Sequence, residues 1–349
     1  SAMCFGALVY MPLLTERDTP GILGAINMLL LWSNSLRLKK MTFRAKLIRG
    51  IERMIVKTLR CLLILAIAGA VFAQSSFEVE NQKWREKRDK ELKAEDSWLT
   101  VAGLFWLKEG QNTFGTGNDQ SIVLPLGSAP ARVGTLELVN GVVTLKVVRG
   151  IRVLVSNQPV NEVEMRFDGD DPPPLFTVAS LKLSVIKRGN RYGLRVRDTK
   201  SAARREFTGL RWFPARASYR VTATFTPDPQ AKEITIMNVL GDEINMKTPG
   251  TLSFQLKGKT YQLRPVIEDD EKLFIIFKDR TAGKTTYGAG RFLYADLPRD
   301  GKVVLDFNRA ENPPCAFTPY ATCPLPPKQN HLPIAIDAGE MDFHLKNPK

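Results

Sequence analysis

The sequence contains few of the residues on which hydrolytic enzymes most often depend. Its 349 residues include two histidines, His331 and His344, and both stand close to the C-terminus. It has no Gly-x-Ser-x-Gly motif, in which a strained turn exposes a nucleophilic serine. With two candidate general bases and no such turn, a catalytic triad of serine, histidine and an acid is disfavoured.

Phosphate-binding loops are missing as well. The Gly-Lys-Thr sequence at 283–285 matches the end of such a loop, but Lys278 stands where the motif needs its first glycine. The residues that follow predict a turn and a strand, whereas the motif requires a helix there. The Gly-Ala-Gly sequence at 288–290 lacks the third glycine of a dinucleotide-binding turn. We therefore expect no nucleotide and no other cofactor.

Apolar runs long enough to cross a membrane are absent. Spanning a bilayer takes about 18 or more apolar residues in a helix, and the apolar segments at 21–32 and 61–72 have twelve residues each. The second segment follows two basic residues and precedes Ala73, an order that is typical of a secretory signal peptide. We predict a signal peptide over residues 54–73 and no stable membrane span after its removal.

Export is the consequence of that prediction. Residues 1–53 would lie upstream of a start at Met54, and we interpret them as a non-native segment outside the working protein. The processed chain would begin at Gln74 and is predicted to be periplasmic or extracellular. Of the four cysteines, Cys315 and Cys323 remain after processing, in a compartment where disulfides persist.

A cluster of basic residues is also missing. The formal net charge of the sequence is +14, but residues 1–73 carry ten lysines and arginines against three acidic residues. The processed chain therefore has a net charge of about +7, and its basic residues are scattered. Nucleic-acid binding needs basic residues gathered on one face or stripe. We expect no nucleic-acid partner, and the sequence leaves the oligomeric state open.

What the processed chain does contain is a succession of short alternating runs. One helix is predicted over residues 76–95, with Ser76 as a candidate N-cap, inside an N-terminal segment at 74–98. From residue 99 onward, alternating apolar and polar residues are separated by Gly, Asn and Pro. Asn140-Gly141 between two such runs is a strong signal for a β-hairpin.

These runs predict an all-β protein in two parts. Residues 99–200 predict a β-sandwich, and residues 201–349 predict a second antiparallel β domain that is barrel-like. The alternation stops over residues 198–218, where we expect a short helical or looped connector.

The segment at 312–327 is unusual, because six of its sixteen residues are proline and two are cysteine. Pro319 lies between Cys315 and Cys323 and favours a turn that brings them together. In an exported protein this arrangement predicts a disulfide. Zinc binding by the two thiolates and His331 is the alternative, although seven residues separate the cysteines instead of the usual two to four.

A second potential metal site lies at the C-terminus. Glu340, Asp342 and His344 alternate there and would share one face of a strand. A polar chain end explains the same residues without a metal, so we predict no metal site.

A group of polar and aromatic residues around the proline-rich segment is the strongest candidate for a ligand site. It consists of Tyr287, Arg291, Asp306, Asn308, Asn312 and Tyr320, with Trp212 as a further member. We expect Asp306 and Asn308 on the same face of one strand. An arginine and an asparagine on a β scaffold suit a carboxylate or sugar-like ligand, so a small polar or acidic ligand is the expected partner. Alternatively, these side chains hydrogen-bond the backbone of the proline-rich segment, where prolines have removed donors.

Part of the first β domain resembles a known fold. The sequence "LKEGQNTFGTGNDQSIVLP", followed by "GTLELVNGVVTLKVV", resembles the forkhead-associated domain over about residues 99–197. That family binds phosphothreonine peptides through an arginine after the glycine and through a serine and a histidine in the next loop. Here Thr116 replaces the arginine, and the next loop has no histidine. Because the phosphate would lose its charge-assisted donor, we expect the fold without the phosphopeptide function.

The second half resembles another family. The sequences "TYGAGRFLYADLP", "LDFNRAENPPCAFTPYATCPLPP" and "LPIAIDAGE" resemble the signature of a bacterial family known as domain of unknown function 1684. The resemblance covers essentially the whole processed chain, and His331 stands where the family has an arginine. It implies the two-part β architecture and an exported location, and it implies no reaction.

The sequence as a whole predicts an exported protein that binds a small ligand or a component of the cell envelope. An enzyme is the main alternative, namely a hydrolase with its site beside the loop at 306–323. A purely structural interaction protein is the third. A carboxylate with a strongly raised pKa would favour the enzyme over the binding module.

Overall fold

The computed structural model describes residues 76–169, 175–267 and 272–344, together with the single residues Met28, Trp32 and Met54. The predicted non-native segment at 1–53 and the predicted signal peptide at 54–73 therefore lie, apart from those single residues, outside the described residues. Within the described ranges, no helix is both long enough and apolar enough to cross a membrane. From Ser76 onward the chain forms one compact unit.

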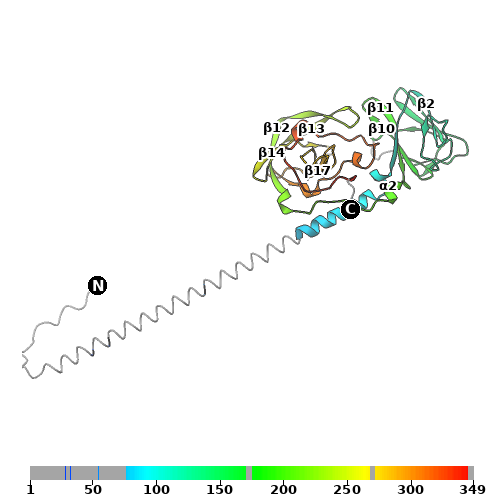
Figure 1. The fold of residues 1–349 in the computed structure, drawn as a ribbon. Helices are drawn as coiled ribbons and strands as arrows, with labels where there is room; N and C mark the ends of the chain where they lie inside the picture. The colour runs from blue at the N-terminus through cyan, green and yellow to red at the C-terminus, as the bar shows by residue number, and fades with distance from the viewer. Residues whose placement is uncertain are drawn as a thin grey trace, which may run out of the picture. The chain divides into compact units, whose positions relative to one another are not determined.

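The first half of this unit is a β-sandwich of two sheets. The strands of one sheet are β2 (Gly110–Gly115), β3 (Ile122–Val123), β4 (Gly134–Val139), β5 (Val142–Val147) and β8 (Glu162–Met165). Those of the other are β1 (Val101–Trp106), β6 (Leu154–Val155), β7 (Gln158–Pro159), β9 (Phe176–Val178), β10 (Leu181–Arg188) and β11 (Arg191–Asp198). The strand orders are β3-β2-β4-β5-β8 and β1-β11-β10-β9-β6-β7. Figure 1 labels β2 of the first sheet and β10 and β11 of the second.

The alternating sequence of these strands explains their burial. Every second residue of β4 is buried, as expected for a strand with one face on a core. The core between the two sheets contains Phe114, Leu136, Leu145, Leu183 and Leu194. The predicted sandwich is therefore confirmed.

The predicted hairpin at Asn140-Gly141 is also confirmed. Strands β4 and β5 pair in antiparallel register, with Val139 opposite Val142. Asn140 and Gly141 have φ angles of 51° and 82°, which are the left-handed values that a two-residue turn of this kind requires.

The second half contains two further antiparallel sheets. A four-stranded sheet consists of β12 (Arg220–Met237), β13 (Glu243–Leu256), β14 (Lys259–Leu263) and β18 (Lys302–Asp306), in the order β14-β13-β12-β18. A three-stranded sheet consists of β15 (Val266–Ile267), β16 (Lys272–Phe277) and β17 (Arg291–Asp296), in sequence order. Leu252, Ile275 and Phe307 belong to the core between them. The all-β class is confirmed, but among the described strands no pairing joins the two sheets, so the barrel does not close.

After its exposed first residue, Lys272, strand β16 is apolar and buried, because both of its faces are covered. Ile275 faces the core between the two sheets, whereas Phe274 and Ile276 join a second cluster on the opposite face. Phe292 of β17 belongs to that second cluster, and alternation along β17 places Tyr294 on the same face. This outer face of β16 and β17 is the floor of the candidate site described below.

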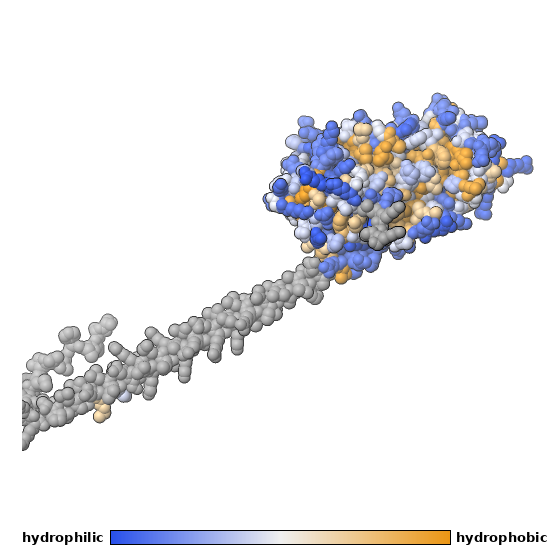
Figure 2. All heavy atoms as spheres, in the orientation of Figure 1, coloured by the Kyte–Doolittle hydropathy of each residue, from blue (hydrophilic) through white to orange (hydrophobic). Residues whose placement is uncertain are grey.

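The predicted helix covers residues 76–92 of the described chain, and Ser76 is itself helical rather than an N-cap. Trp84 meets the ring of Trp212 edge-on, with the ring centroids 5.3 Å apart. The helix therefore packs against the second half of the unit. Most of its visible residues in Figure 2 are hydrophilic, while hydrophobic residues form patches over the strands above it.

Short helices occupy the irregular segments. The 3₁₀-helix η1 (Trp98–Thr100) leads into β1. The connector between the halves contains α2 (Ala202–Arg205) and η2 (Ala217–Tyr219), in agreement with the short helical or looped segment that the sequence predicts. The C-terminal segment contains η3 (Phe307–Arg309), η4 (Pro314–Ala316) and η5 (Lys328–Asn330).

Candidate functional site

Arg291, the first residue of β17, is buried inside the second half, with 1% of its surface exposed. Its Nη2 lies 2.6 Å from the carboxylate of Asp279 and donates to the carbonyl of Ile336 at 3.0 Å. Its Nη1 donates to the carbonyl of Ala338. The guanidinium thereby joins the C-terminal segment to the sheet by hydrogen bonds. Both Nη1 and Nη2 donate to groups within the protein.

Asp306 and Asn308 do not share the face of one strand, contrary to the sequence-based expectation. Strand β18 ends at Asp306 and the chain turns into η3, so the Asp306 carboxylate accepts from Asn308 Nδ2 at 2.9 Å. The Asn308 side chain also accepts from the backbone N–H of Arg216 and donates to its carbonyl, both at 2.9 Å. Asn308 therefore joins the end of β18 to the connector.

The remaining candidates divide between backbone support and the surface. Asn312 Nδ2 donates to the carbonyl of Met341 at 2.8 Å, and the Tyr287 hydroxyl donates to the carbonyl of Cys315 at 2.8 Å. Tyr320 is 38% exposed. Arg291, Asn308, Asn312 and Tyr287 thus hydrogen-bond backbone groups of irregular segments, as the second interpretation of the sequence describes.

The predicted disulfide between Cys315 and Cys323 is not formed, and both residues are free thiols in the structure. The backbone N–H of Cys315 donates to Cys323 Sγ at 3.2 Å. A hydrogen bond between the two side chains lowers the pKa of the Cys315 thiol and raises that of Cys323. The pair is therefore joined by hydrogen bonds in place of a covalent bond. His331, the third ligand of the zinc alternative, is exposed, and its Nε2 lies 3.1 Å from the carbonyl oxygen of Pro326.

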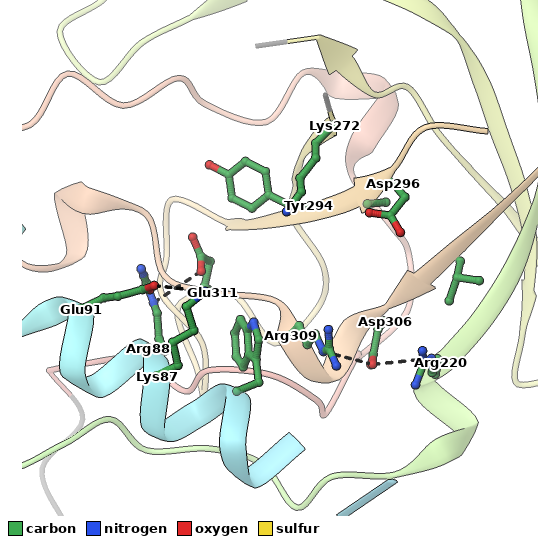
Figure 3. Close-up of a pocket in the computed structure, with 13 residues that line it drawn as sticks. Lys87, Arg88, Glu91, Arg220, Lys272, Tyr294, Asp296, Asp306, Arg309 and Glu311 are labelled. Carbon is green, nitrogen blue, oxygen red and sulfur yellow. Dashed lines mark ion pairs between the residues drawn. The ribbon is translucent and has the colours of Figure 1, made fainter. Parts of the chain in front are cut away.

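A groove lies between the helix at 76–92 and the outer faces of β17 and β18 (Figure 3). Its cavity has a volume of about 430 Å³. We call it the helix groove, and its lining consists of Trp84, Lys87, Arg88, Glu91, Arg220, Lys272, Tyr294, Ala295, Asp296, Val304, Asp306, Arg309 and Glu311. Of the six candidates from the sequence, Asp306 lines this groove.

A second cavity of about 430 Å³ continues from the first, because the two share Arg88, Tyr294 and Glu311. We call it the interface cavity, since its lining comes from both halves of the unit. Its other lining residues are Trp98, Arg188, Phe274, Phe292, Pro314, Thr322, Cys323 and Pro324. Ligand sites occur preferentially at such junctions between domains.

Two carboxylates share one arginine where the cavities meet. Arg88 Nε lies 3.0 Å from Glu340 and 3.4 Å from Glu311. Glu340 is fully buried and also accepts from the backbone N–H of Asn312 at 2.7 Å. Burial raises the pKa of Glu311 to about 7, and the nearby negative charge of Glu340 adds to this shift, although the positive charge of Arg88 opposes it. Glu311 therefore changes charge near neutral pH on the wall of both cavities.

A second acidic group stands on the opposite side of the helix groove, as Figure 3 shows. Asp306 Oδ2 lies 3.6 Å from Arg309 Nε and 4.0 Å from Arg220 Nε. This oxygen is buried and accepts no hydrogen bond within the described chain. Both arginines also pair with Glu80 of the helix. Asp306 and Glu311 thus line opposite sides of the groove, each beside at least one guanidinium.

The floor of the helix groove is aromatic. Tyr294 is 42% exposed, and its ring stacks on Phe274 with centroids 5.0 Å apart and planes 14° apart. The register of β16 and β17 places Tyr294 opposite Phe274 and Lys272 opposite Asp296. One end of the floor therefore carries a flat apolar surface, and the other carries a cross-strand pair of opposite charge.

A comparison with protein families finds one match, and its description names no activity. Residues 205–341 match the family described as "Protein of unknown function (DUF1684)". No curated protein matches the chain. The predicted bacterial origin and export stay predictions.

Several solved structures are similar to parts of this chain. An uncharacterised protein from gene locus rrnAC0354 of Haloarcula marismortui is 33% identical, with 41% of this chain and 82% of that chain covered and a TM-score of 0.35. The FhaA FHA domain, solved with the intracellular domain of Rv3910, is 19% identical, with 27% and 97% covered and a TM-score of 0.20. An FHA domain from a study of phosphothreonine-dependent interactions is also 19% identical, with 27% and 92% covered and a TM-score of 0.20.

Proposed function

We propose that the helix groove binds a small polar ligand that has a ring or another flat face. The observation that carries this proposal is the exposed ring of Tyr294, which is held flat against Phe274 beside the charged pair of Lys272 and Asp296. A ring stacked on Tyr294 would cover apolar surface that is otherwise in contact with water. Its hydroxyl or carboxylate groups would reach donors and acceptors on the same floor.

The size and charge of the groove support this ligand class. Its volume of about 430 Å³ lies within the range of about 300–1,000 Å³ that is typical of small-molecule sites. The lining contains both cationic and acidic side chains, with Arg309 and Asp306 on one side and Arg88 and Glu311 on the other. A mixture of donors and acceptors suits a hydroxyl-rich or weakly acidic ligand better than a strongly charged one.

A binding screen tests the proposal. Monosaccharides, uronic acids and small carboxylic acids would be added to the protein, and binding would be followed by thermal shift and then by calorimetry. We expect at least one of these classes to bind, and Tyr294→Ala to weaken that binding at least about fivefold, because stacking on one aromatic ring is worth roughly 1 kcal/mol or more. Tyr320→Ala is the matched control, since Tyr320 is an exposed tyrosine that does not line the groove. Equal effects of the two substitutions would contradict the proposal.

A second candidate function is acid–base catalysis in the same groove. Glu311 favours it, because a carboxyl group with a pKa of about 7 can donate and accept a proton at neutral pH. Asp306 would supply the second carboxyl group on the opposite side, and many glycoside hydrolases use two such groups in different roles. This candidate agrees with the hydrolase alternative that the sequence allows.

Turnover separates the two candidates. For an enzyme, Glu311→Gln should abolish hydrolysis of a chromogenic glycoside or ester while the ligand still binds. For a binding module, wild-type protein should bind the ligand and release it unchanged, as seen by NMR of the recovered ligand. The absence of any turnover across the substrates that bind would exclude the catalytic role of Glu311.

We also propose that the protein is exported, from the order of basic, apolar and small residues at 54–73. Intact-mass analysis of protein recovered from its host provides the test. We expect a mass that begins at Gln74, and a mass that includes residues 54–73 would contradict export by this route.

A further inference from the structure

Arg195 is a buried cation for which the described chain provides no anion. It lies in the middle of β11, where Leu194 and Val196 point into the sandwich core. Alternation therefore turns Arg195 to the opposite face of the sheet, toward the second half of the unit. The residue is only 5% exposed, although guanidinium groups are rarely buried without a partner.

The surroundings of Arg195 make this burial costly. Its Nε and Nη2 are buried and have no hydrogen-bond partner among the residues that the structure describes. Burial, and then the neighbouring cations Arg188 and Arg197, lower the pKa of the guanidinium to about 10. Arg188 is neutralised by Asp168, whose Oδ2 lies 2.8 Å from its Nη2. Among the described residues Arg195 has no ion pair of its own. Asp168 favours its charged form, but that carboxylate is already paired with Arg188, whereas buried polar groups normally find partners.

Trp98 connects this charge to the interface cavity. The guanidinium groups of Arg195 and Arg197 lie 5.3 Å and 5.9 Å from the centroid of its indole ring. Trp98 lines the interface cavity, and so does Arg188, whose Nε donates to Thr322 at 3.0 Å. Arg195 thus lies behind the Trp98 wall of the cavity, in a cluster of three guanidiniums. Asp168 pairs with Arg188, and Asp96 and Asp168 both act on Arg197.

A cation–π contact does not satisfy such a group. The contact with Trp98 offers attraction to the guanidinium as a whole, but it accepts no hydrogen bond from Nε and Nη2 in a directed way. A carboxylate or a phosphoryl group has paired oxygens that match the guanidinium fork and carries the missing negative charge. Such a group would therefore supply both the acceptors and the charge that match this cluster.

We propose that Arg195, with Arg197 and Arg188 beside it, binds a carboxylate or phosphoryl group that enters through the interface cavity between Trp98 and Thr322. This inference rests on the proposed function, because the interface cavity continues from the helix groove through Arg88, Tyr294 and Glu311. The ligand class is thereby narrowed to molecules with a ring at one end and an acidic group at the other. The acidic group lies at Arg195 and the ring lies on Tyr294.

Titration with inorganic phosphate and with acetate tests the site. Each is added to the full processed chain at constant ionic strength, with chloride as the balancing ion, and the melting temperature and the heat of binding are recorded. We expect a saturable rise in melting temperature with at least one anion, and its loss in Arg195→Met. Phosphate alone would indicate a phosphoryl group, and acetate alone would indicate a carboxylate. No saturable effect from either anion would overturn the proposal.

Arg191→Met is the matched control. Arg191 lies on the same strand, and its guanidinium also faces a tryptophan ring, Trp106, at 4.3 Å. However, it is partly exposed and paired with Asp242 at 2.5 Å. Arg191→Met should leave the response to the anion unchanged. The same loss in both variants would show that the anion acts through general charge and would overturn the site.

Stability without the anion separates a binding role from a structural role. Arg195→Met replaces an unpaired buried charge by an apolar side chain, so in chloride alone we expect it to unfold at the same or a higher temperature than the wild type. If it fails to fold, or unfolds at a clearly lower temperature, Arg195 is structural and the proposal is wrong. Arg195→Lys keeps the positive charge but loses the paired N–H donors of the planar guanidinium. This variant should bind the anion at least about tenfold more weakly.

The two proposals can fail independently. Tyr294→Ala should lose the ring-bearing ligand and keep the response to inorganic phosphate or acetate. If a ring-bearing ligand binds through Tyr294 but neither anion binds, the Arg195 site is wrong and the proposed function stands. If an anion binds through Arg195 but no ring-bearing ligand depends on Tyr294, the proposed function is wrong and the anion site stands.

Discussion

Arg88 and Glu340 are ion-paired at 3.0 Å although 252 residues separate them in the chain. Arg88 comes from the helix at 76–92, whereas Glu340 lies near the end of the described chain. The pair joins the two extremes of the compact unit, and Glu311 completes it as a second acidic partner at 3.4 Å.

Loss of Arg88 should destabilise the fold strongly. Arg88→Met leaves Glu340 and Glu311 buried without their cation, and breaking a buried pair in this way costs roughly 3–5 kcal/mol. Denaturant unfolding at pH 8, where both carboxyl groups are ionised in the unfolded chain, measures the change. Lys87→Met is the control, because the ion pair of Lys87 with Glu91 is exposed and is worth about 0.5 kcal/mol. If both variants lost a similar free energy of unfolding, the buried ion pairs of Arg88 would stabilise the fold no more than the exposed pair of Lys87 does.

Stability should fall as the pH rises from about 4.5 to about 7. The pKa of Glu311 is raised from its ordinary 4.5 to about 7 in the folded protein, so the folded state holds a proton that the unfolded state has released. Its contribution is complete below about pH 4.5 and is lost by about pH 7, with a total on the order of 3 kcal/mol. Glu311→Gln cannot titrate, so its free energy of unfolding should change less over this range. Equal slopes for variant and wild type, measured in urea at several pH values, would contradict the assignment.

Arg291 should be essential for folding rather than for binding alone. Its guanidinium is 1% exposed and paired with Asp279 at 2.6 Å, so Arg291→Ala leaves a buried carboxylate and two carbonyls without their partner. We expect a loss of roughly 3–5 kcal/mol in denaturant unfolding. Arg280→Met, at an exposed position nearby in the sequence, should change the stability by less than about 0.5 kcal/mol. An Arg291→Ala variant as stable as the wild type would show that the buried pair contributes little.

The two cysteines should react as free thiols of unequal reactivity. The hydrogen bond from Cys323 lowers the pKa of the Cys315 thiol, and Cys315 is also the less buried of the two. Native protein treated with iodoacetamide should therefore be alkylated first at Cys315, as peptide mass spectrometry would show. Titration of unfolded, unreduced protein that begins at Gln74, and so lacks Cys4 and Cys61, should give two thiols. A result of zero would establish the disulfide that the sequence predicts, and stoichiometric zinc would support the metal alternative.

Local sequence signals were sufficient for the strands. The alternation of β4 and β5 and the Asn140-Gly141 turn depend on neighbours in the chain, so they can be read without tertiary information. The apolar run of β16 likewise indicates a strand covered on both faces. The sequence could not show whether the sheets of the second half close into a barrel, because pairing between distant strands depends on how the sheets pack.

The candidate site shows the limit of this reasoning. Tyr294 lies within "TYGAGRFLYADLP", where alternation could have shown an aromatic residue on the outer face of a strand. Arg88 carries no such signal, since it is one of many charged residues on a helix. Arg291 and Asn308 have residue types that suit a ligand, but the irregular C-terminal segment uses them to satisfy its own backbone.

By itself the sequence determined the all-β class, the sandwich, the hairpin at Asn140-Gly141 and the N-terminal helix, because these follow from periodicity and turn chemistry over a few residues. Only the tertiary structure decided which charged groups are buried, which of them share a partner and which have none. Burial and pairing depend on segments as distant as Arg88 and Glu340, and they determine the pKa of Glu311 and the unpaired charge of Arg195.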